Sequence, residues 1–257
     1  MSITIKTKEE IEILREGGRR LALILQEVAK AVKPGVSTDT LNDIAEKMVS
    51  DNGDIAAFLN YRPRGAKRAY PSSICVSVND EIVHGIPNED PKILREGDIV
   101  SLDMGLTHKG LITDSAITVP VGKIDEATQK LLDITKEALT AGINAVKAGK
   151  RVGDIGFAVE RVAKANGFGV VEDLCGHGVG YEVHEDPYIP NYGQKGKGDL
   201  LRAGMVIAIE PMLNQGDKDI FLDEDGWTYK TVDGKISAHF EHTLVVTSKG
   251  AEILTKI

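Results

Sequence analysis

The chain has 257 residues, a net charge of −8 and 42% hydrophobic residues. This acidic balance argues against a general nucleic-acid binder. The sequence has no run of about 18 apolar residues that would indicate a membrane span, and residues 1–6 lack the apolar stretch of a signal peptide. With two cysteines, Cys75 and Cys175, we expect a cytoplasmic protein whose thiols are reduced and lie in the core or in a pocket wall.

Apolar residues at helical spacing predict two pairs of helices. The expected helices cover residues 7–32, 37–53, 125–149 and 153–167. Thr7 and Glu10 have the spacing of a capping box at the first start, while Pro34 and Gly35 end that helix. Asp125 is the expected cap of the third helix, which should extend to Gly149.

The two helix pairs resemble each other in sequence. Residues 31–53 and 145–167 align without a gap and share seven identities in 23 positions: Ala31/Ala145, Val32/Val146, Lys33/Lys147, Gly35/Gly149, Glu46/Glu160, Asn52/Asn166 and Gly53/Gly167. Coincidence between helices is one explanation. An internal duplication is the other, and it predicts one domain over residues 1–257 with halves of roughly 7–121 and 122–257 that share a central site.

A predicted hairpin brings the first two candidate ligands together. Asp103 and Asp114 lie in segments that alternate apolar and polar residues. A two-residue turn at 108–109 would place them directly opposite each other on the polar face. Two carboxylates that face each other repel, so such a pair in a half-buried hairpin indicates a cation. Two solvated surface acids are the alternative.

Three further residues have contexts that suit a metal ligand. Glycines flank His177 on both sides, and Glu210 ends an apolar run just before Pro211. Glu241 falls within a strand predicted over residues 238–246, where a carboxylate needs a partner. Each residue alone is unremarkable. The set of four carboxylates and one imidazole is too highly charged for a fold to gather without cations.

These residues lie in motifs that resemble the bacterial-type, type I methionine aminopeptidases of peptidase family M24. The resemblance runs nearly end to end, and its marks are Val78-Asn79, His84-Gly85-Ile86-Pro87, Leu102-Asp103-Met104-Gly105, Thr113-Asp114-Ser115-Ala116, Cys175-Gly176-His177-Gly178-Val179-Gly180, His184-Glu185-Asp186-Pro187, Ile209-Glu210-Pro211-Met212 and Glu241-His242-Thr243. It implies an α/β (α+β) chain with the pita-bread (creatinase/aminopeptidase) fold. In that fold, two pseudo-symmetric halves place helices outside a curved antiparallel sheet.

The resemblance also implies a function and a metal cofactor. The enzyme would remove the initiator methionine from nascent proteins whose second residue is small, by attack of a hydroxide held between two metal ions on the first peptide bond. Asp103 would bind one ion, Asp114 and Glu241 would bridge, and His177 and Glu210 would bind the other. An oxygen-rich set with one imidazole suits Mn, Fe or Co at least as well as Zn.

Further site residues follow from the same resemblance. His84 matches the histidine that contacts the scissile amide nitrogen, His184 matches the one that binds the substrate carbonyl oxygen, and Glu210 would shuttle the proton. The methionine pocket would consist of Phe58, Tyr61, Tyr70, Cys75, Val183 and Trp227. Relatives often have phenylalanine in place of Val183 and a smaller thiol in place of Phe58. Ordinary core packing is the alternative for the aromatic residues, and His108, His239 and His242 receive no role.

Other functions remain open at this point. Prolidases and aminopeptidases P use the same ligands on bonds to proline but usually carry an extra N-terminal domain, whereas this sequence reaches its first helix almost at once. A non-catalytic module of this fold would have lost ligands, and a dinuclear phosphoesterase would show a histidine-rich pattern. Type II enzymes carry a helical insertion for which the segment between His184 and Glu210 is too short.

The expected partner is the N-terminal peptide of a nascent protein. The basic segment 62–68 is either a solvated loop, which we favour, or a weak, salt-dependent contact with the ribosome surface. We expect a monomer without membrane attachment and without a specific nucleic-acid ligand.

Overall fold

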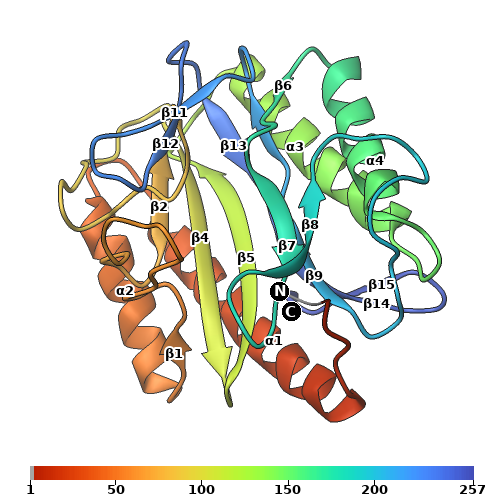
Figure 1. The fold of residues 1–257 in the computed structure, drawn as a ribbon. Coiled ribbons are helices and arrows are strands. Elements are labelled where there is room, and N and C mark those ends of the chain that lie inside the picture. The colour runs from red at the N-terminus through yellow and green to blue at the C-terminus, as the bar shows by residue number, and fades with distance from the viewer. Residues whose placement is uncertain (1–2) are drawn as a thin grey trace.

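The helices of this protein lie outside its strands in two pairs (Figure 1). The computed structural model describes residues 3–257, so Met1 and Ser2, which belong to the stretch considered for a signal peptide, lie outside the described residues. The helices are α1 (Lys8–Ala31), α2 (Thr38–Asp51), α3 (Glu126–Ala145) and α4 (Val152–Ala165). No helix in residues 3–257 is long and apolar enough to cross a lipid bilayer.

The helix ends follow from local chemistry, with one departure from expectation. The capping box of α1 is confirmed, because Thr7 accepts a hydrogen bond from the backbone N–H of Glu10 and donates its own N–H to the Glu10 carboxylate. Helix α3 ends at Ala145 rather than at Gly149. Val146 takes extended angles (φ −74°, ψ 126°), and the Gly149 N–H bonds to a carbonyl outside the helix.

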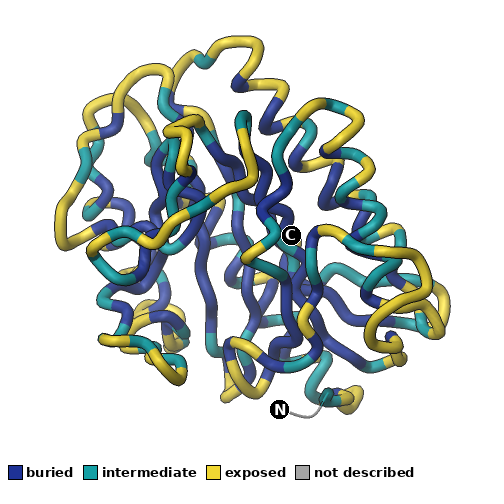
Figure 2. Tube along the Cα trace, turned by 45° about the horizontal axis from the view of Figure 1, so that its top comes forward, coloured by how far each residue is buried: buried dark blue, intermediate teal, exposed yellow. Residues whose placement is uncertain are grey.

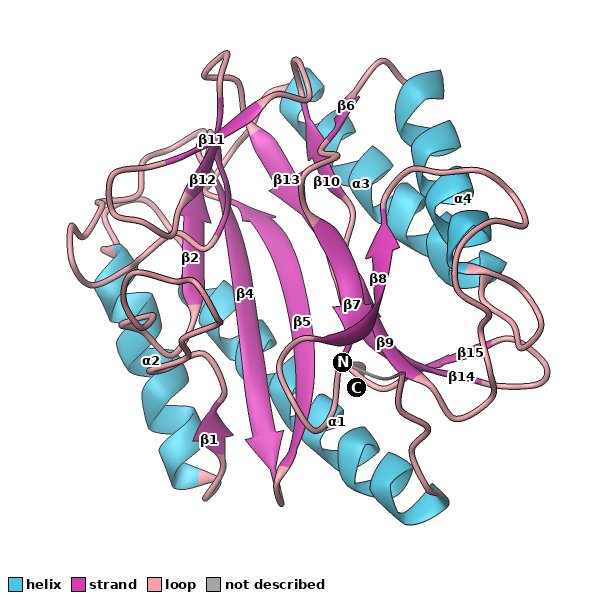
Figure 3. Ribbon diagram, in the orientation of Figure 1, coloured by secondary structure: helices cyan, strands magenta, loops and turns pink. Residues whose placement is uncertain are grey.

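The strands form four antiparallel hydrogen-bonded sheets within the described chain (Figure 3). The first contains β1 (Ile55–Ala56), β2 (Cys75–Val78), β4 (Ile99–His108) and β5 (Leu111–Pro120), and the largest has the order β15 (Ala251–Ile253), β14 (His242–Val246), β9 (Val206–Ile209), β7 (Cys175–Gly178), β8 (Glu185–Pro190). Two smaller sheets have the orders β13 (Ser237–His239), β10 (Met212–Asn214), β6 (Gly169–Val170) and β11 (Ile220–Leu222), β12 (Tyr229–Thr231), β3 (Glu81–Val83). The antiparallel layer is therefore subdivided rather than continuous.

Each helix pair packs on its own half of the strand layer. The apolar residues of α1 and α2 form one core with the residues of β4 that alternate along one face, namely Val100, Leu102, Met104 and Leu106. A second core joins α3 and α4 to β9 and β10. The central strands are buried while the outer helix faces are exposed (Figure 2). Because successive strand residues point to opposite faces, Asp103 lies on the face of β4 that points away from the helices.

The two halves repeat each other in backbone geometry as well as in sequence. The chain leaves the first helix of each pair through a glycine with positive φ, Gly35 at 87° and Gly149 at 90°. It leaves the second helix in the same way, through Gly53 at 68° and Gly167 at 80°. Helices α2 and α4 have 14 residues each. Positive φ is costly for residues with a Cβ atom, which explains why glycine occupies all four positions.

Candidate metal centre

The hairpin β4–β5 places Asp103 and Asp114 on one face, but in a different register from the expected one. Gly105 pairs with Asp114, and Asp103 pairs with Ala116. The two aspartates are therefore diagonal neighbours, not direct partners. The predicted pairing of β4 with β5 was wrong by two residues. The turn lies at Lys109 (φ 49°) and Gly110 (φ 81°). A tight hairpin turn needs positive φ at both central residues, which favours a pair that includes the glycine.

The strand expected over residues 238–246 is interrupted at Phe240 and Glu241. It divides into β13, which pairs with β10, and β14, which pairs with β9. Glu210 occupies the equivalent break between β9 and β10. A residue at such a break is released from the regular alternation of its strand, so both glutamate side chains can turn toward β5.

Hydrogen bonds join the two halves at this break. The Asp114 N–H donates to Thr243 Oγ1 (2.9 Å), which donates in turn to the Asp114 carbonyl (2.7 Å). Ser115 Oγ donates to the Glu241 carbonyl (2.8 Å). The backbone that carries Asp114 and Glu241 is thus fixed by buried bonds before any ligand is considered.

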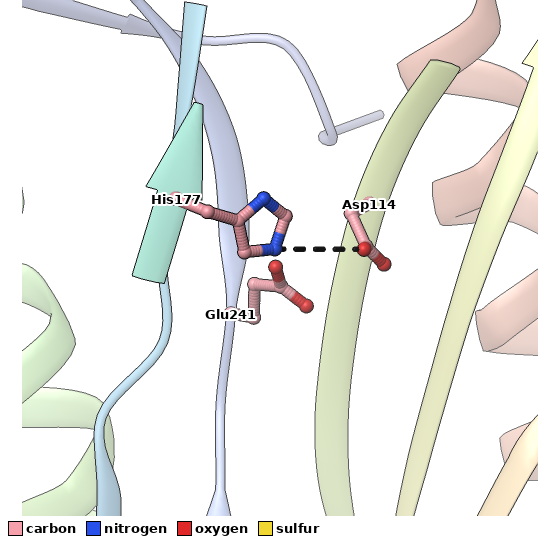
Figure 4. Close-up of side chains that lie close together, drawn as sticks. All are labelled: Asp114, His177 and Glu241. Carbon is pink, nitrogen blue, oxygen red and sulfur yellow. Dashed lines mark ion pairs between the residues drawn. The ribbon is translucent and has the colours of Figure 1, made fainter. Parts of the chain in front are cut away.

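All five candidate ligands line one pocket. Asp114, His177 and Glu241 each offer an atom within 4.8 Å of the others (Figure 4). His177 Nε2 lies 3.9 Å from Asp114 Oδ2 and 3.3 Å from Glu210 Oε1. Asp103 is 6% exposed, and Asp103 Oδ1 and Asp114 Oδ1 are buried without a hydrogen-bond partner. Buried carboxylate oxygens without partners suit a cation that would complete them.

The four carboxyl groups of the site have raised pKa values, so they retain protons that a bound cation would displace. Burial raises the pKa of Asp114 to about 7. Burial also raises the pKa of Asp103, Glu210 and Glu241 well above the usual range, and the neighbouring charge of Asp114 adds to each shift. Without a cation the four groups cannot all ionise together. Binding of a divalent ion would therefore be coupled to the release of protons.

His177 is held in the state that a metal ligand requires. Burial is the main cause that lowers its pKa to about 3, so the ring is neutral near pH 7. Its Nδ1 lies 2.9 Å from the Gly178 carbonyl oxygen. Since a carbonyl only accepts, Nδ1 carries the proton, and the lone pair of Nε2 points at the acids.

The two further histidines lie around the same pocket. His84 has a positive φ of 61°, which is uncommon for a residue with a side chain and is often found at functional positions. Burial lowers the pKa of His84 to about 4. The His184 ring centre lies 4.4 Å from that of His177, and its Nδ1 lies 2.8 Å from the Tyr61 hydroxyl. Both rings are within reach of a molecule in the pocket.

The expected side-chain pocket forms one wall of this space. Of the six residues predicted for the methionine pocket, five line the cavity: Phe58, Tyr61, Tyr70, Cys75 and Trp227. Val183 packs in the same apolar cluster but is not among the lining residues. Gly105 makes room for the Phe58 ring, because a Cβ atom there would lie 2.8 Å from Phe58 Cε1. Both cysteines are free thiols, with Cys75 buried and Cys175 half-buried.

His239, to which the sequence analysis gave no role, lies beside the acids. It is 1% exposed, its Nε2 lies 3.6 Å from Glu210 Oε2, and both ring nitrogens lack a hydrogen-bond partner. The sequence offered a clue, because in the unbroken strand predicted over residues 238–246 His239 and Glu241 would share one face. His108 instead ends β4, where Nδ1 lies 2.7 Å from Asp54 Oδ1.

Comparison with known proteins agrees with this geometry. Methionine aminopeptidase 1 of Bacillus subtilis is 45% identical over 255 residues, which cover 99% of this chain and all of that protein. The crystal structure of methionine aminopeptidase from Thermotoga maritima superposes with a TM-score of 0.94 at 44% identity and covers 100% of both chains. Prolidase from Pyrococcus furiosus superposes with a TM-score of 0.77 at 25% identity, over 98% of this chain and 65% of the prolidase.

These structural neighbours confirm the pita-bread fold that the sequence predicted, with helices outside an antiparallel strand layer. Residues 12–248 match the sequence profile of metallopeptidase family M24. The match includes all five candidate ligands and both pocket histidines. The chain therefore belongs to metallopeptidase family M24.

Proposed function

We propose that this protein is a methionine aminopeptidase that removes the initiator methionine from nascent proteins whose second residue is small. The observation that carries the proposal is the convergence of three buried carboxylates, the half-buried carboxylate of Glu210 and one neutral imidazole in a pocket that aromatic side chains also line. Relatives that span the whole chain at 45% and 46% identity are named methionine aminopeptidases, and the family is one of metallopeptidases.

The proposed cofactor is a pair of divalent cations, with Co, Mn, Fe and Zn as candidates. Asp103 would bind one ion, Asp114 and Glu241 both, and His177 and Glu210 the other. The unpartnered oxygens of Asp103 and Asp114 support this donor set, as does the orientation of His177 Nε2. About four negative charges would be balanced by two divalent ions. When bound, divalent cations lower the pKa of water toward neutrality and so supply the nucleophile.

The protein's own residues would position the substrate and move the proton. Glu210 borders the pocket and would accept a proton from water at a carboxylate oxygen and deliver it to the departing amine. His84 would donate a hydrogen bond to the scissile nitrogen once attack on the carbonyl has freed the lone pair of that nitrogen. His184 would donate from its ring to the carbonyl oxygen, where negative charge grows during attack.

The aromatic wall would select the first side chain of the substrate. A flexible, polarisable thioether packs well against rings, and Phe58, Tyr61, Tyr70 and Trp227 supply them beside the thiol of Cys75. Val183 packs in the same apolar cluster without lining the pocket. An N-terminal amine adds a second anchor, because it can bind a cation and fix the first peptide bond above the acids, whereas an internal bond offers no such group.

The proposed function is tested by comparing the rates at which peptides of different sequence are hydrolysed. With Mn²⁺ or Co²⁺ present, we expect hydrolysis of Met-Ala-Ser, with Ala-Ala-Ser and Met-Leu-Ser cleaved more slowly by about 100-fold or more, because each changes a side chain that the site selects. Release of free methionine measured by chromatography decides the point. Equal cleavage of Ala-Ala-Ser would contradict selection by the aromatic wall.

A prolidase-like activity is the second candidate, since the fold is shared with a prolidase. A methionine aminopeptidase selects the first side chain of its substrate, whereas a prolidase selects a proline in the second position. Preferential hydrolysis of Xaa-Pro dipeptides in the same assay would select this alternative.

We further propose a single domain over residues 1–257 with halves at roughly 7–121 and 122–257. The site supports this division, because Asp103 and Asp114 come from the first half and His177, Glu210 and Glu241 from the second. The repeated geometry of the two helix pairs supports a common origin. Neither half alone would contain the proposed metal centre.

We also propose that the protein is a cytoplasmic monomer. Residues 62–68 would attach it at most weakly to ribosomes. Within that segment Arg68 is bonded to both carboxylate oxygens of Glu89 (2.6 and 2.7 Å), and Arg62 to two carbonyls of its own loop. Arg64 and Lys67 are exposed. Co-sedimentation with ribosomes should therefore be salt-sensitive and fall when both are changed to Ala. Unchanged co-sedimentation would eliminate this segment as a contact.

A further inference from the structure

The turn that carries His184 is held by the carboxylate that follows it. Residues 179–184 connect β7 to β8, and Glu185 is the first residue of β8. Glu185 Oε1 accepts hydrogen bonds from the backbone N–H groups of Tyr181 (2.6 Å) and Glu182 (3.2 Å). One carboxylate oxygen therefore bonds to two backbone N–H groups of the turn. We expect these two hydrogen bonds to fix the conformation of Val183 and His184.

The other carboxylate oxygen of Glu185 is bound by the N-terminal segment. Lys6 Nζ lies 2.7 Å from Glu185 Oε2, and the two side chains are 0% and 3% exposed. Thr4 Oγ1 donates to the same oxygen (2.5 Å) and also contacts the Lys6 ammonium group. An ion pair this deeply buried forms a unit, because removing either partner leaves a charge without compensation.

The ammonium group also contacts the turn directly. Lys6 Nζ lies 4.2 Å from the centre of the Tyr181 ring, and the Tyr181 hydroxyl donates to Glu10 at the start of α1 (2.7 Å). A Cβ atom on Gly180 would come within 2.4 Å of Lys6 Cε, so the lysine side chain fills the space that a larger residue would need. The Lys6 N–H bonds to the Gly204 carbonyl (2.8 Å), which holds the segment against the loop that precedes β9.

Neither member of the pair reaches the pocket. Lys6 and Glu185 are absent from its lining, whereas His184, the residue immediately before Glu185, lines it and contacts the His177 ring and the Tyr61 hydroxyl. The Glu185 backbone also pairs with Gly178, next to His177, but the Glu185 carboxylate binds the turn, so we expect the ion pair to act on a substrate through the turn.

We propose that Lys6 and Glu185 form a buried ionic clamp by which the N-terminal segment positions the turn 179–184, and with it His184, over the candidate metal centre. Both are positioning residues that act through His184. The consequence for turnover rests on the proposed function, while the consequence for the conformation of the turn does not.

The conformational part is tested by NMR of the histidine rings in the full-length chain, with Zn²⁺ as a diamagnetic probe and the His184 resonances identified from their loss in His184→Ala. We expect Lys6→Met to shift the His184 resonances, while those of His242, whose ring bonds to Thr255, stay in place. Lys218→Met is the matched control, because Lys218 Nζ also lies 2.7 Å from a carboxylate, that of Glu172, but on the surface (52% and 37% exposed). Unchanged His184 resonances in folded Lys6→Met would overturn the proposal.

A second variant covers the case in which Lys6→Met does not fold. Lys6→Met combined with Glu185→Met replaces the ion pair by apolar side chains of similar length, which is often tolerated. It still removes the acceptor of the Tyr181 and Glu182 N–H groups. We therefore expect this double variant to melt close to the wild type and nevertheless to show displaced His184 resonances. Wild-type resonances in the double variant would refute the clamp.

The functional part is tested by hydrolysis of Met-Ala-Ser with Mn²⁺. A displacement of about 1 Å in a positioned group can lower rates by about 100-fold, so we expect kcat of Lys6→Met to fall at least about tenfold, with a smaller change in KM. In a His184→Ala background the same substitution should change kcat by less than about twofold, because Lys6 acts through the missing ring. An equal loss in both backgrounds would contradict the mechanism. If the wild type itself leaves Met-Ala-Ser intact, the proposed function fails and the NMR result still decides the clamp.

Discussion

Asp114→Asn is expected to abolish metal binding and hydrolysis together. Asp114 lies close to His177 and Glu241, since each of the three offers an atom within 4.8 Å of the others. Its charge also adds to the raised pKa of Asp103, Glu210 and Glu241. Its backbone is bonded on both sides to Thr243, so the amide would replace the carboxylate without moving the strand. Loss of an outer partner of a metal ligand weakens affinity by about 10- to 100-fold. Loss of a charged ligand shared by two ions should exceed that range.

The same substitution has the opposite effect on the protein without metal. Burial raises the folded-state pKa of Asp114 from its ordinary value of 3.8 to about 7. A carboxyl group with a raised folded pKa contributes stability below its unfolded pKa, and this contribution is lost as the pH rises to the folded value. Asparagine never ionises. Metal-free Asp114→Asn should therefore melt at a higher temperature than metal-free wild type, and the difference should grow from pH 5 to pH 8.

Bound Mn²⁺ measured by mass spectrometry and melting curves with and without Mn²⁺ test both statements. Asp133→Asn is the matched control, because Asp133 is an exposed acid on α3 and should leave both quantities unchanged. Full metal content in Asp114→Asn would remove Asp114 from the proposed ligand set. A lower melting temperature without metal would show that the carboxylate is stabilised by something other than a cation.

The alternation of apolar and polar residues predicted the face of the hairpin on which Asp103 and Asp114 lie. It did not predict which residues of β4 and β5 pair. Alternation along β4 predicts that Asp103 points away from Val100 and Leu102, and it does. The register depended on which two residues form the turn, and a shift of the turn moves the partner of Asp103 from Asp114 to Ala116 while keeping the face. The polar face was therefore predictable, whereas the diagonal contact required backbone angles.

Contacts between distant segments were beyond the reach of local pattern. The bonds of Thr243 to Asp114 join two halves of the chain, and a threonine in an apolar strand gives no indication of its partner. The same holds for Lys6 and Glu185, which are 179 residues apart and look like solvated surface charges in sequence. Long-range pairing of this kind depends on the completed fold. The resemblance to known sequences, in contrast, named five ligands and two histidines that line one pocket, although it gave no role to His239 and placed Val183 in the pocket wall.

Removing the His84 side chain is expected to leave metal binding intact and to eliminate most turnover. His84 lines the pocket but is not one of the five proposed metal ligands. With a pKa lowered to about 4 by burial, the ring is neutral near pH 7 and would act by donating a hydrogen bond. Proton transfer and hydrogen bonding by one positioned side chain contribute about 100- to 10,000-fold to a rate. We expect a loss of kcat in that range, with little change in bound Mn²⁺.

The choice of substitution matters, because the backbone of His84 has a φ of 61°. Alanine at this position would be strained, so a loss of activity in His84→Ala would mix a catalytic effect with a displaced loop. Glycine adopts this angle freely, and asparagine tolerates it while retaining a donor. His84→Gly should therefore match the wild type in metal content and approach it in melting temperature, yet lose turnover, and His84→Asn should recover part of it. Turnover of His84→Gly within about tenfold of the wild type, below the range expected for a positioned donor, would show that the ring has no part in the reaction.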